Sequence, residues 1–161
     1  MCIRDRATLN LCKDLSVEEW DLVMSVNLRG MFLMTKHAIP LFNDNASILN
    51  ISSQAARRAQ RFTAHYNASK MGVIGFTRAV ALELAPKVRV NAIAPVAGKT
   101  PLLKSFMGGN TPQKKQAFLS TIPIGRFSNP QDMGNAACFL CSDEASMITG
   151  TVLEVDGGRC I

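Results

Sequence analysis

The hydrophobic and polar residues of this chain fall into two patterns that alternate along its length. Short β-rich apolar runs predict strands, and longer apolar stretches with capping residues predict helices. The predicted helices cover 16–42, 64–84 and 129–141, with two short helical pieces in 99–120, and the predicted strands cover 46–53, 87–94 and 151–155. Because strands alternate with helices, the chain is expected to form an α/β structure, a doubly wound parallel sheet with helices on both faces.

The chemistry suggested by the sequence lies where the first predicted strand meets the second helix. Tyr66 and Lys70 are four positions apart on that helix, so they lie on one face, one turn apart. A free phenol has a pKa near ~10 and is a poor base, but an ammonium group beside it favours the phenolate. Ser53 closes the strand thirteen residues before Tyr66 (66 − 53), and its hydroxyl could hold a substrate oxygen. Ser52 competes for this role, and the spacing favours Ser53. These residues can move a proton, provided that another group moves a hydride.

Five motifs then occur in one order along the chain. They are Val26-Asn27-Leu28-Arg29-Gly30, Ser53, Tyr66-Asn67-Ala68-Ser69-Lys70, Val90-Asn91-Ala92-Ile93-Ala94-Pro95 and Val155-Asp156-Gly157-Gly158. In this combination, from about Leu15 to Ile161, the chain resembles the short-chain dehydrogenase/reductase family.

The resemblance implies a Rossmann-type fold and hydride transfer between NAD or NADP and a secondary alcohol or ketone. It assigns Tyr66 as the acid/base and Ser53 as the residue that positions the substrate oxygen. It implies that Lys70 favours the ionised form of Tyr66 and binds the nicotinamide ribose, and that Asn27 loosens its helix and holds a water in a relay to Lys70. A catalytically silent nucleotide-sensing or scaffold protein of the same fold remains the alternative. His65, next to Tyr66, is expected at the rim of the site, since adjacent helix residues point apart.

The segment after the 87–94 strand departs from the family pattern. The resemblance implies that Pro95, Val96, Gly98 and Thr100 belong to a loop that covers the nicotinamide. In the family a Gly usually follows the Pro, whereas here Val96 follows it and the Gly stands two residues on, at Gly98. The path of this loop is therefore left open. The region from Thr100 to Ile122 is expected to shape the substrate pocket as a mobile lid.

The start of the chain lacks the strand and Gly-rich turn with which the family normally begins. Residues 1–6 resemble a translated sequencing adapter and are expected to be foreign. Residues 7–161 are therefore interpreted as the C-terminal portion of a single Rossmann-fold dehydrogenase domain, which alone would be a partial product without activity. The residue that selects NAD or NADP would lie in the missing part.

Composition narrows the class of protein. A hydrophobic content of 47% and a charged content of 19% argue against disorder, and no apolar run is long enough to span a membrane. Five scattered Cys favour a reducing cytoplasm over a disulfide framework, and the lone Cys138-x-x-Cys141 pair is not expected to bind metal. The net charge of +6 comes without a nucleic-acid motif, so no nucleic-acid partner is expected. Arg57, Arg58 and Arg61 either form a solvated loop or attract an anionic substrate or cofactor phosphates.

The helices at 16–42 and 64–84 are apolar nearly all round, so more than one side of each must be covered. The expected cover is another subunit of a homodimer or homotetramer, as in the family. The alternative is that the missing N-terminal part buries them.

Overall fold

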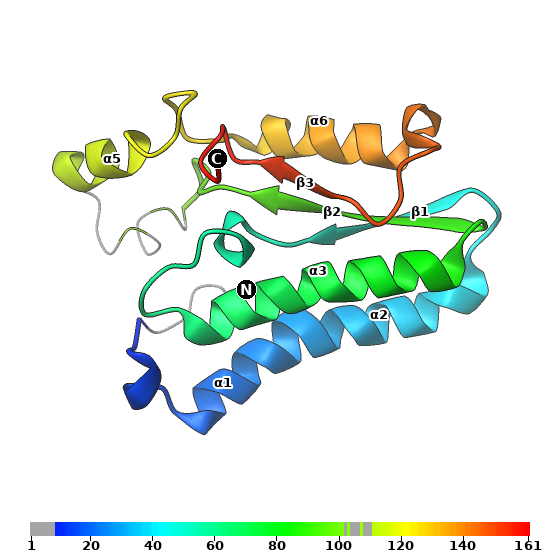
Figure 1. Ribbon diagram of the computed structural model, residues 1–161, viewed down its shortest axis with the longest axis horizontal. Coiled ribbons are helices and arrows are strands. Elements are labelled where there is room, and N and C mark those ends of the chain that lie inside the picture. The colour runs from blue at the N-terminus through cyan, green and yellow to red at the C-terminus, as the bar shows by residue number, and fades with distance from the viewer. Residues whose placement is uncertain (1–8, 102, 104–106, 108–110) are drawn as a thin grey trace.

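The computed structural model describes residues 9–101, 103, 107 and 111–161, and it contains a parallel sheet of three strands (Figure 1). β1 (Ala46–Ile51), β2 (Val88–Pro95) and β3 (Val152–Val155) lie in the order β1-β2-β3. α3 (Ala64–Leu84) connects β1 to β2 on one face, and α6 (Pro130–Cys141) covers the other face (Figure 1). The predicted α/β fold with helices on both faces is thus confirmed.

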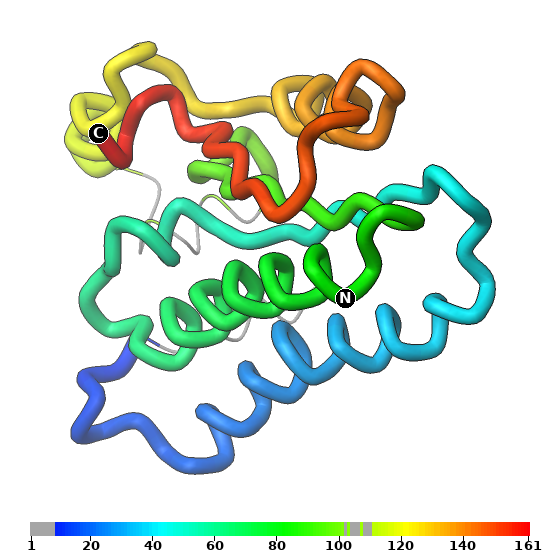
Figure 2. Tube along the Cα trace, turned by 45° about the vertical axis from the view of Figure 1, so that its right-hand side comes forward, coloured from blue at the N-terminus to red at the C-terminus, as the bar shows by residue number. Residues whose placement is uncertain are grey.

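The predicted helix at 16–42 is one rod with a wide turn in its middle. α1 (Val17–Met24) begins with a capping box, in which the Glu19 amide donates to the Ser16 hydroxyl and the Glu19 carboxylate accepts from the Ser16 amide. A π-helical turn follows over Ser25–Arg29, then α2 (Gly30–Ala38) and a 3₁₀ turn over Ile39–Leu41. The rod runs along α3, on the side of α3 away from the sheet (Figures 1 and 2).

The main hydrophobic core lies between α3 and the sheet. Its fully covered members are Val80, Ala81, Val88 and Val90, and the partly buried residues packed against them are Phe42, Ala46, Ile48, Phe76 and Leu84. Several large apolar side chains of α2 and α3 stay outside this core; Met34 is 74% and Leu82 is 84% exposed. The apolar pattern of both helices predicts such exposed side chains wherever no other part of the chain packs against the helices.

The two ends of α6 are fixed in different ways. At its start, Asn129 and Asp132 form a capping box around Pro130. At its end, the Arg89 guanidinium, projecting from β2, donates to the Leu140 carbonyl at 2.7 Å and to the Ser142 carbonyl at 2.9 Å. A cation thus satisfies carbonyls that the helix leaves without partners.

The remaining helical elements are short. α5 (Pro112–Leu119) begins at the Thr111 cap, and single 3₁₀ turns occupy Cys12–Asp14, Gln54–Ala56 and Asp143–Ala145. Seven residues of the expected lid lie outside the described residues: Leu102, Lys104, Ser105, Phe106, Gly108, Gly109 and Asn110. None of the described helices combines the length and the apolar character needed to cross a membrane. Cys138 and Cys141 are exposed free thiols.

Candidate active site

Tyr66 and Lys70 lie on the first two turns of α3, as the sequence predicts. Lys70 is 6% exposed, and its ammonium nitrogen lies 5.8 Å from the centroid of the Tyr66 ring. The same nitrogen donates to the Ile51 carbonyl at 2.9 Å, at the last residue of β1. A buried cation is costly unless it is held by good hydrogen bonds, and here the end of a strand supplies one.

The two adjacent serines at the end of β1 have different partners. The Ser52 hydroxyl is fully buried and donates to the Lys70 carbonyl at 2.9 Å. The Ser53 hydroxyl oxygen accepts from the Ala55 amide at 3.2 Å and caps the Gln54–Ala56 turn. Ser52 and Lys70 therefore tie β1 to α3 reciprocally, since each side chain bonds backbone on the other element. The serine that the spacing favours, Ser53, is the one whose hydroxyl does not bond α3.

Asn27 occupies the centre of the π-helical turn and reaches α3. Its side-chain amide donates to the Ser69 hydroxyl at 3.0 Å, and that hydroxyl donates to the Tyr66 carbonyl at 2.8 Å. A turn of this kind marks a local irregularity in a helix, often at a functional site. The structure thus gathers Asn27, Tyr66, Lys70 and the end of β1 around the first turns of α3. Ser69 belongs to the Tyr66–Lys70 motif, but the sequence alone assigns it no role. Its position three residues after Tyr66 indicates that the two residues share a helix face.

The segment after β2 follows a path that explains the displaced glycine. The Val96 amide still donates to the Val155 carbonyl at 3.2 Å, so Val96 extends the sheet. Gly98 forms a parallel bridge with Ser128, and a Cβ at Gly98 would lie 3.0 Å from the Ser128 hydroxyl oxygen. The glycine is therefore needed where the chain passes close to the segment before α6. Thr100 is exposed, and its amide donates to the Gly98 carbonyl at 2.8 Å.

The prediction that His65 lies at the rim is wrong. His65 is 1% exposed, and neither ring nitrogen has a hydrogen-bond partner among the described residues. Burial lowers its pKa, with Glu19 acting in the opposite direction, so the neutral imidazole is favoured. The side chain does point away from Tyr66, as adjacent helix positions must, but that side of α3 is covered, since α1 packs against the helix.

Two of the three loop arginines bond the C-terminal segment. The Arg57 guanidinium pairs with the Glu154 carboxylate at 2.9 Å, and Arg58 donates to the Arg159 carbonyl at 2.9 Å. Arg159 in turn donates to the Thr121 hydroxyl at 2.7 Å, which holds the end of the chain beside α5 (Figure 2). Attraction of an anion by this loop stays a prediction.

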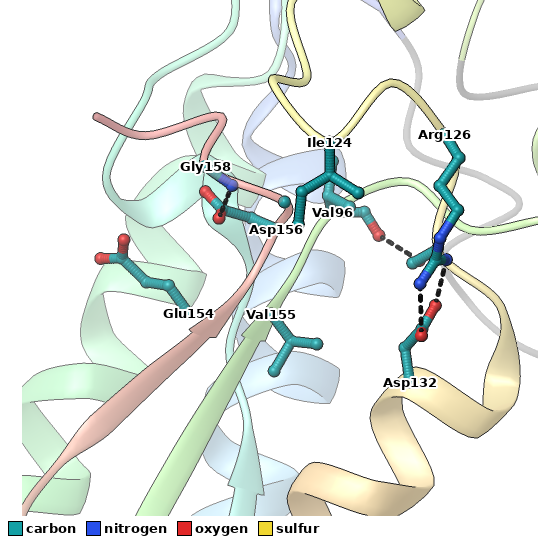
Figure 3. A pocket seen from close by; sticks show the side chains of 10 residues that line it. Val96, Ile124, Arg126, Asp132, Glu154, Val155, Asp156 and Gly158 are labelled. Carbon is teal, nitrogen blue, oxygen red and sulfur yellow. Dashed lines mark hydrogen bonds and ion pairs between the residues drawn. The ribbon is translucent and has the colours of Figure 1, made fainter.

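A cavity of about 320 Å³ opens at the carboxyl ends of β2 and β3 (Figure 3). Its lining includes Val96 but none of Asn27, Ser53, Tyr66 and Lys70. Two of its four charged side chains pair with each other, while Glu154 pairs with Arg57 and Asp156 accepts from backbone amides. Arg126 and Asp132 form a bidentate pair at 2.7 and 2.8 Å, and this pairing lowers the pKa of Asp132 to about 2.

The one group of potential metal ligands found among the described residues is engaged in protein contacts. Glu154, Asp156 and Cys160 offer ligand atoms within 4.8 Å of one another. Asp156 accepts from the amides of Gly158 and Cys160, both at 2.9 Å. Burial, followed by the hydrogen bond to Asp156, raises the pKa of the Cys160 thiol to about 11. A thiol that stays protonated is a poor metal ligand.

Comparisons with known proteins identify the family to which the chain is similar. A family model described as enoyl-(acyl carrier protein) reductase matches residues 5–159. The chain belongs to the short-chain dehydrogenase/reductase family. Among curated members of the family, the chain is 40% identical over 148 residues to 4-formylbenzenesulfonate dehydrogenase of Comamonas testosteroni. This match covers 89% of the chain and 59% of the dehydrogenase. The chain is 41% identical over 148 residues to the 3-oxoacyl-[acyl-carrier-protein] reductase of Thermotoga maritima, covering 89% and 58%.

A solved short-chain dehydrogenase/reductase extends the comparison to the fold. The 3-ketoacyl-(acyl-carrier-protein) reductase of Brucella melitensis, whose crystal structure is a complex with NADH, is 45% identical and superposes with a TM-score of 0.86. The match covers 96% of this chain and 63% of the reductase. The chain therefore spans less than two thirds of the length of these family members.

Proposed function

We propose that this chain is the C-terminal portion of an NAD- or NADP-dependent oxidoreductase that interconverts a secondary alcohol and a ketone. The observation that best supports this proposal is the position of the buried Lys70 ammonium. It donates to the Ile51 carbonyl at the end of β1 and lies 5.8 Å from the centroid of the Tyr66 ring. An ammonium group close to a phenol favours the ionised form of that phenol. Family membership and the order of the motifs support the same assignment.

Each of the four residues has a distinct role in this proposal. A bound nicotinamide supplies or accepts the hydride. In ketone reduction, the Tyr66 hydroxyl gives its proton to the substrate oxygen, and in alcohol oxidation the phenolate takes a proton from it. Ser53 donates a hydrogen bond that keeps this oxygen beside Tyr66. Lys70 stabilises the phenolate and its ammonium can donate to ribose hydroxyls, while Asn27 holds the water through which a proton reaches Lys70.

The donors present suit one half of the cofactor. The Lys70 ammonium suits the nicotinamide ribose, and exposed Thr100 suits the carboxamide. The Val96 amide, in contrast, is taken by the Val155 carbonyl, so Pro95, Val96 and Gly98 would contribute shape to this site. The Gly-rich turn that would hold the pyrophosphate is not in this sequence. We therefore assign residues 7–161 to the C-terminal portion of the enzyme, in line with the partial coverage of the relatives.

Substitutions of Tyr66 and Lys70 in the full-length enzyme, with a control at Lys36, test these catalytic roles. The parent should reduce members of a panel of ketones with NADH or NADPH. Tyr66→Phe should lower turnover by about 10²–10⁴-fold, because general acid–base catalysis contributes that much, while cofactor affinity changes only a few fold. Lys70→Met should lower turnover to a similar extent, and it should also weaken cofactor binding, because the Lys70 ammonium is assigned to the ribose hydroxyls. Lys36→Met is the matched control, since Lys36 lies 5.9 Å over the Phe32 ring but is exposed on α2.

The outcome also decides between catalysis and a silent role. Retention of more than a tenth of the parent turnover by Tyr66→Phe would remove Tyr66 from the mechanism. Cofactor binding without turnover of any ketone would favour the nucleotide-sensing alternative. The exposed apolar side chains of α2 and α3 support assembly of the enzyme as a homodimer or homotetramer through the 16–42 and 64–84 helices.

A further inference from the structure

The hydroxyl of Ser69 joins two parts of the candidate site that are far apart in the sequence. It accepts from the Asn27 side-chain amide at 3.0 Å and donates to the Tyr66 carbonyl at 2.8 Å. Ser69 is fully buried, so water cannot easily replace either bond. One hydroxyl therefore fixes the position of Asn27 relative to the helical turn that carries Tyr66 and Lys70.

The wide turn around Asn27 makes such an anchor necessary. In the π-helical turn, the Gly30 amide donates to the Ser25 carbonyl, five residues back, instead of four. The turn also approaches α3 closely, because a Cβ at Gly72 would lie 2.8 Å from a methyl carbon of Leu28. Gly72 thus permits the close approach, and the Asn27–Ser69 hydrogen bond defines its register.

We propose that Ser69 is a positioning residue that acts through Asn27 on the proton transfer assigned to Tyr66 and Lys70. This inference rests on the proposed function. Ser69 does not touch substrate or cofactor. Its contribution is that Asn27, the proposed holder of the relay water, keeps one place beside α3. A displacement of about 1 Å in a catalytic site can cost on the order of 10²-fold in rate.

The same helix contains a matched control for this bond pattern. The Thr77 hydroxyl accepts from the Asn50 side-chain amide at 3.0 Å and donates to the Val73 carbonyl at 2.8 Å. Like Ser69, Thr77 is fully buried. It lies more than two helical turns further along α3, where it joins the helix to β1 and none of the proposed catalytic residues is involved.

The test compares Ser69→Ala with Thr77→Val in the full-length enzyme, alone and in an Asn27→Ala background. Ser69→Ala leaves the partly buried Asn27 amide without its acceptor, and Thr77→Val does the same to the buried Asn50 amide, so both should lower the melting temperature. Only Ser69→Ala should lower kcat, by about 10- to 100-fold with KM within about 3-fold of the parent value. In the Asn27→Ala background, Ser69→Ala should lower kcat by less than about 3-fold further, because the two residues act as one unit.

Several results would overturn the role of Ser69. These are an unchanged kcat in Ser69→Ala, an equal loss of kcat in Thr77→Val, or full additivity with Asn27→Ala. Tyr66→Phe in the same assay separates this inference from the function on which it rests. If Tyr66→Phe keeps its turnover, the proposed function fails; if only Ser69→Ala keeps it, the function stands and the positioning role fails.

Discussion

Replacing Arg89 by Met removes a cation that holds the end of α6 to the sheet. Met keeps an unbranched apolar stem of similar reach, so the loss is confined to the guanidinium hydrogen bonds. Two of these are short, at 2.7 Å to the Leu140 carbonyl and 2.9 Å to the Ser142 carbonyl. A third contact, to the Ile148 carbonyl at 3.5 Å, is at the limit for a hydrogen bond, so we assign it no contribution to stability.

The two short bonds set the expected size of the effect. A hydrogen bond to a charged group contributes about 1.5–3 kcal/mol, which gives about 3–6 kcal/mol for the pair. Two features reduce this sum. The Ser47 hydroxyl still donates to the Leu140 carbonyl, and Ser142 is only half-buried, so water can reach its carbonyl. We expect a loss of about 2–3 kcal/mol in the free energy of unfolding, or roughly 4–12 °C in melting temperature for an enzyme of this family's size.

Urea denaturation and calorimetry of the full-length enzyme measure this effect. Arg89→Lys keeps the charge but has a single donor centre, so it should recover about half of the loss. Lys87→Met is the control, because the Lys87–Asp44 pair is exposed at 3.7 Å and such pairs contribute about 0–1 kcal/mol. If Arg89→Met is no less stable than Lys87→Met, then water satisfies these carbonyls and the reasoning about the helix end is wrong.

Two further predictions concern the chain alone and the buried histidine. Expressed by itself, the chain should show no turnover and no tight cofactor binding, because the Gly-rich turn is absent from the sequence; micromolar affinity for NAD or NADP in calorimetry would contradict this. Burial lowers the folded-state pKa of His65, so the unfolded state takes up the proton first, and the full-length enzyme should lose stability as the pH falls below about 6.5. Urea midpoints across this range should fall less steeply for His65→Phe than for the parent, and equal slopes would exclude His65 as the cause.

The elements whose limits are encoded locally could be predicted from the sequence. The bounds of α3 agree with the predicted 64–84, and α6 begins at Pro130, behind its Asn129 cap, where the predicted helix begins at 129. In each case residues within one turn of the boundary carry the signal. The first strand is predicted to reach Ser53, but β1 ends at Ile51. The Ser52 amide still donates to the Ile93 carbonyl on β2 at 2.8 Å, and the Ser53 hydroxyl caps the turn that follows.

The features that the sequence did not predict depend on contacts between distant segments. His65 is buried because another helix covers its side of α3, and the pattern of α3 alone does not report this cover. The meaning of Gly98 depends on Ser128, thirty residues later, and the role of Arg89 depends on carbonyls of α6. For the candidate site, the motif placed Tyr66 and Lys70 on one face of a helix, but the bonds through Ser52 and Ser69 come from packing.

The π-helical turn also sets the rotation of α2 relative to α1 around their common axis. Val23 is the buried residue of α1 and Thr35 is the buried residue of α2, twelve positions later. In an uninterrupted α-helix, twelve steps of about 100° would leave them about 120° apart around the axis. A turn that takes up one extra residue removes about 100° of that offset, so they return to within about 20° of the same side. Deleting one residue from Ser25–Arg29 would leave eleven α-helical steps of about 100°, which keeps the two buried residues within about 20° of the same side. A relative with a one-residue alignment gap there would therefore pack this rod in the same way but lack the wide turn around Asn27.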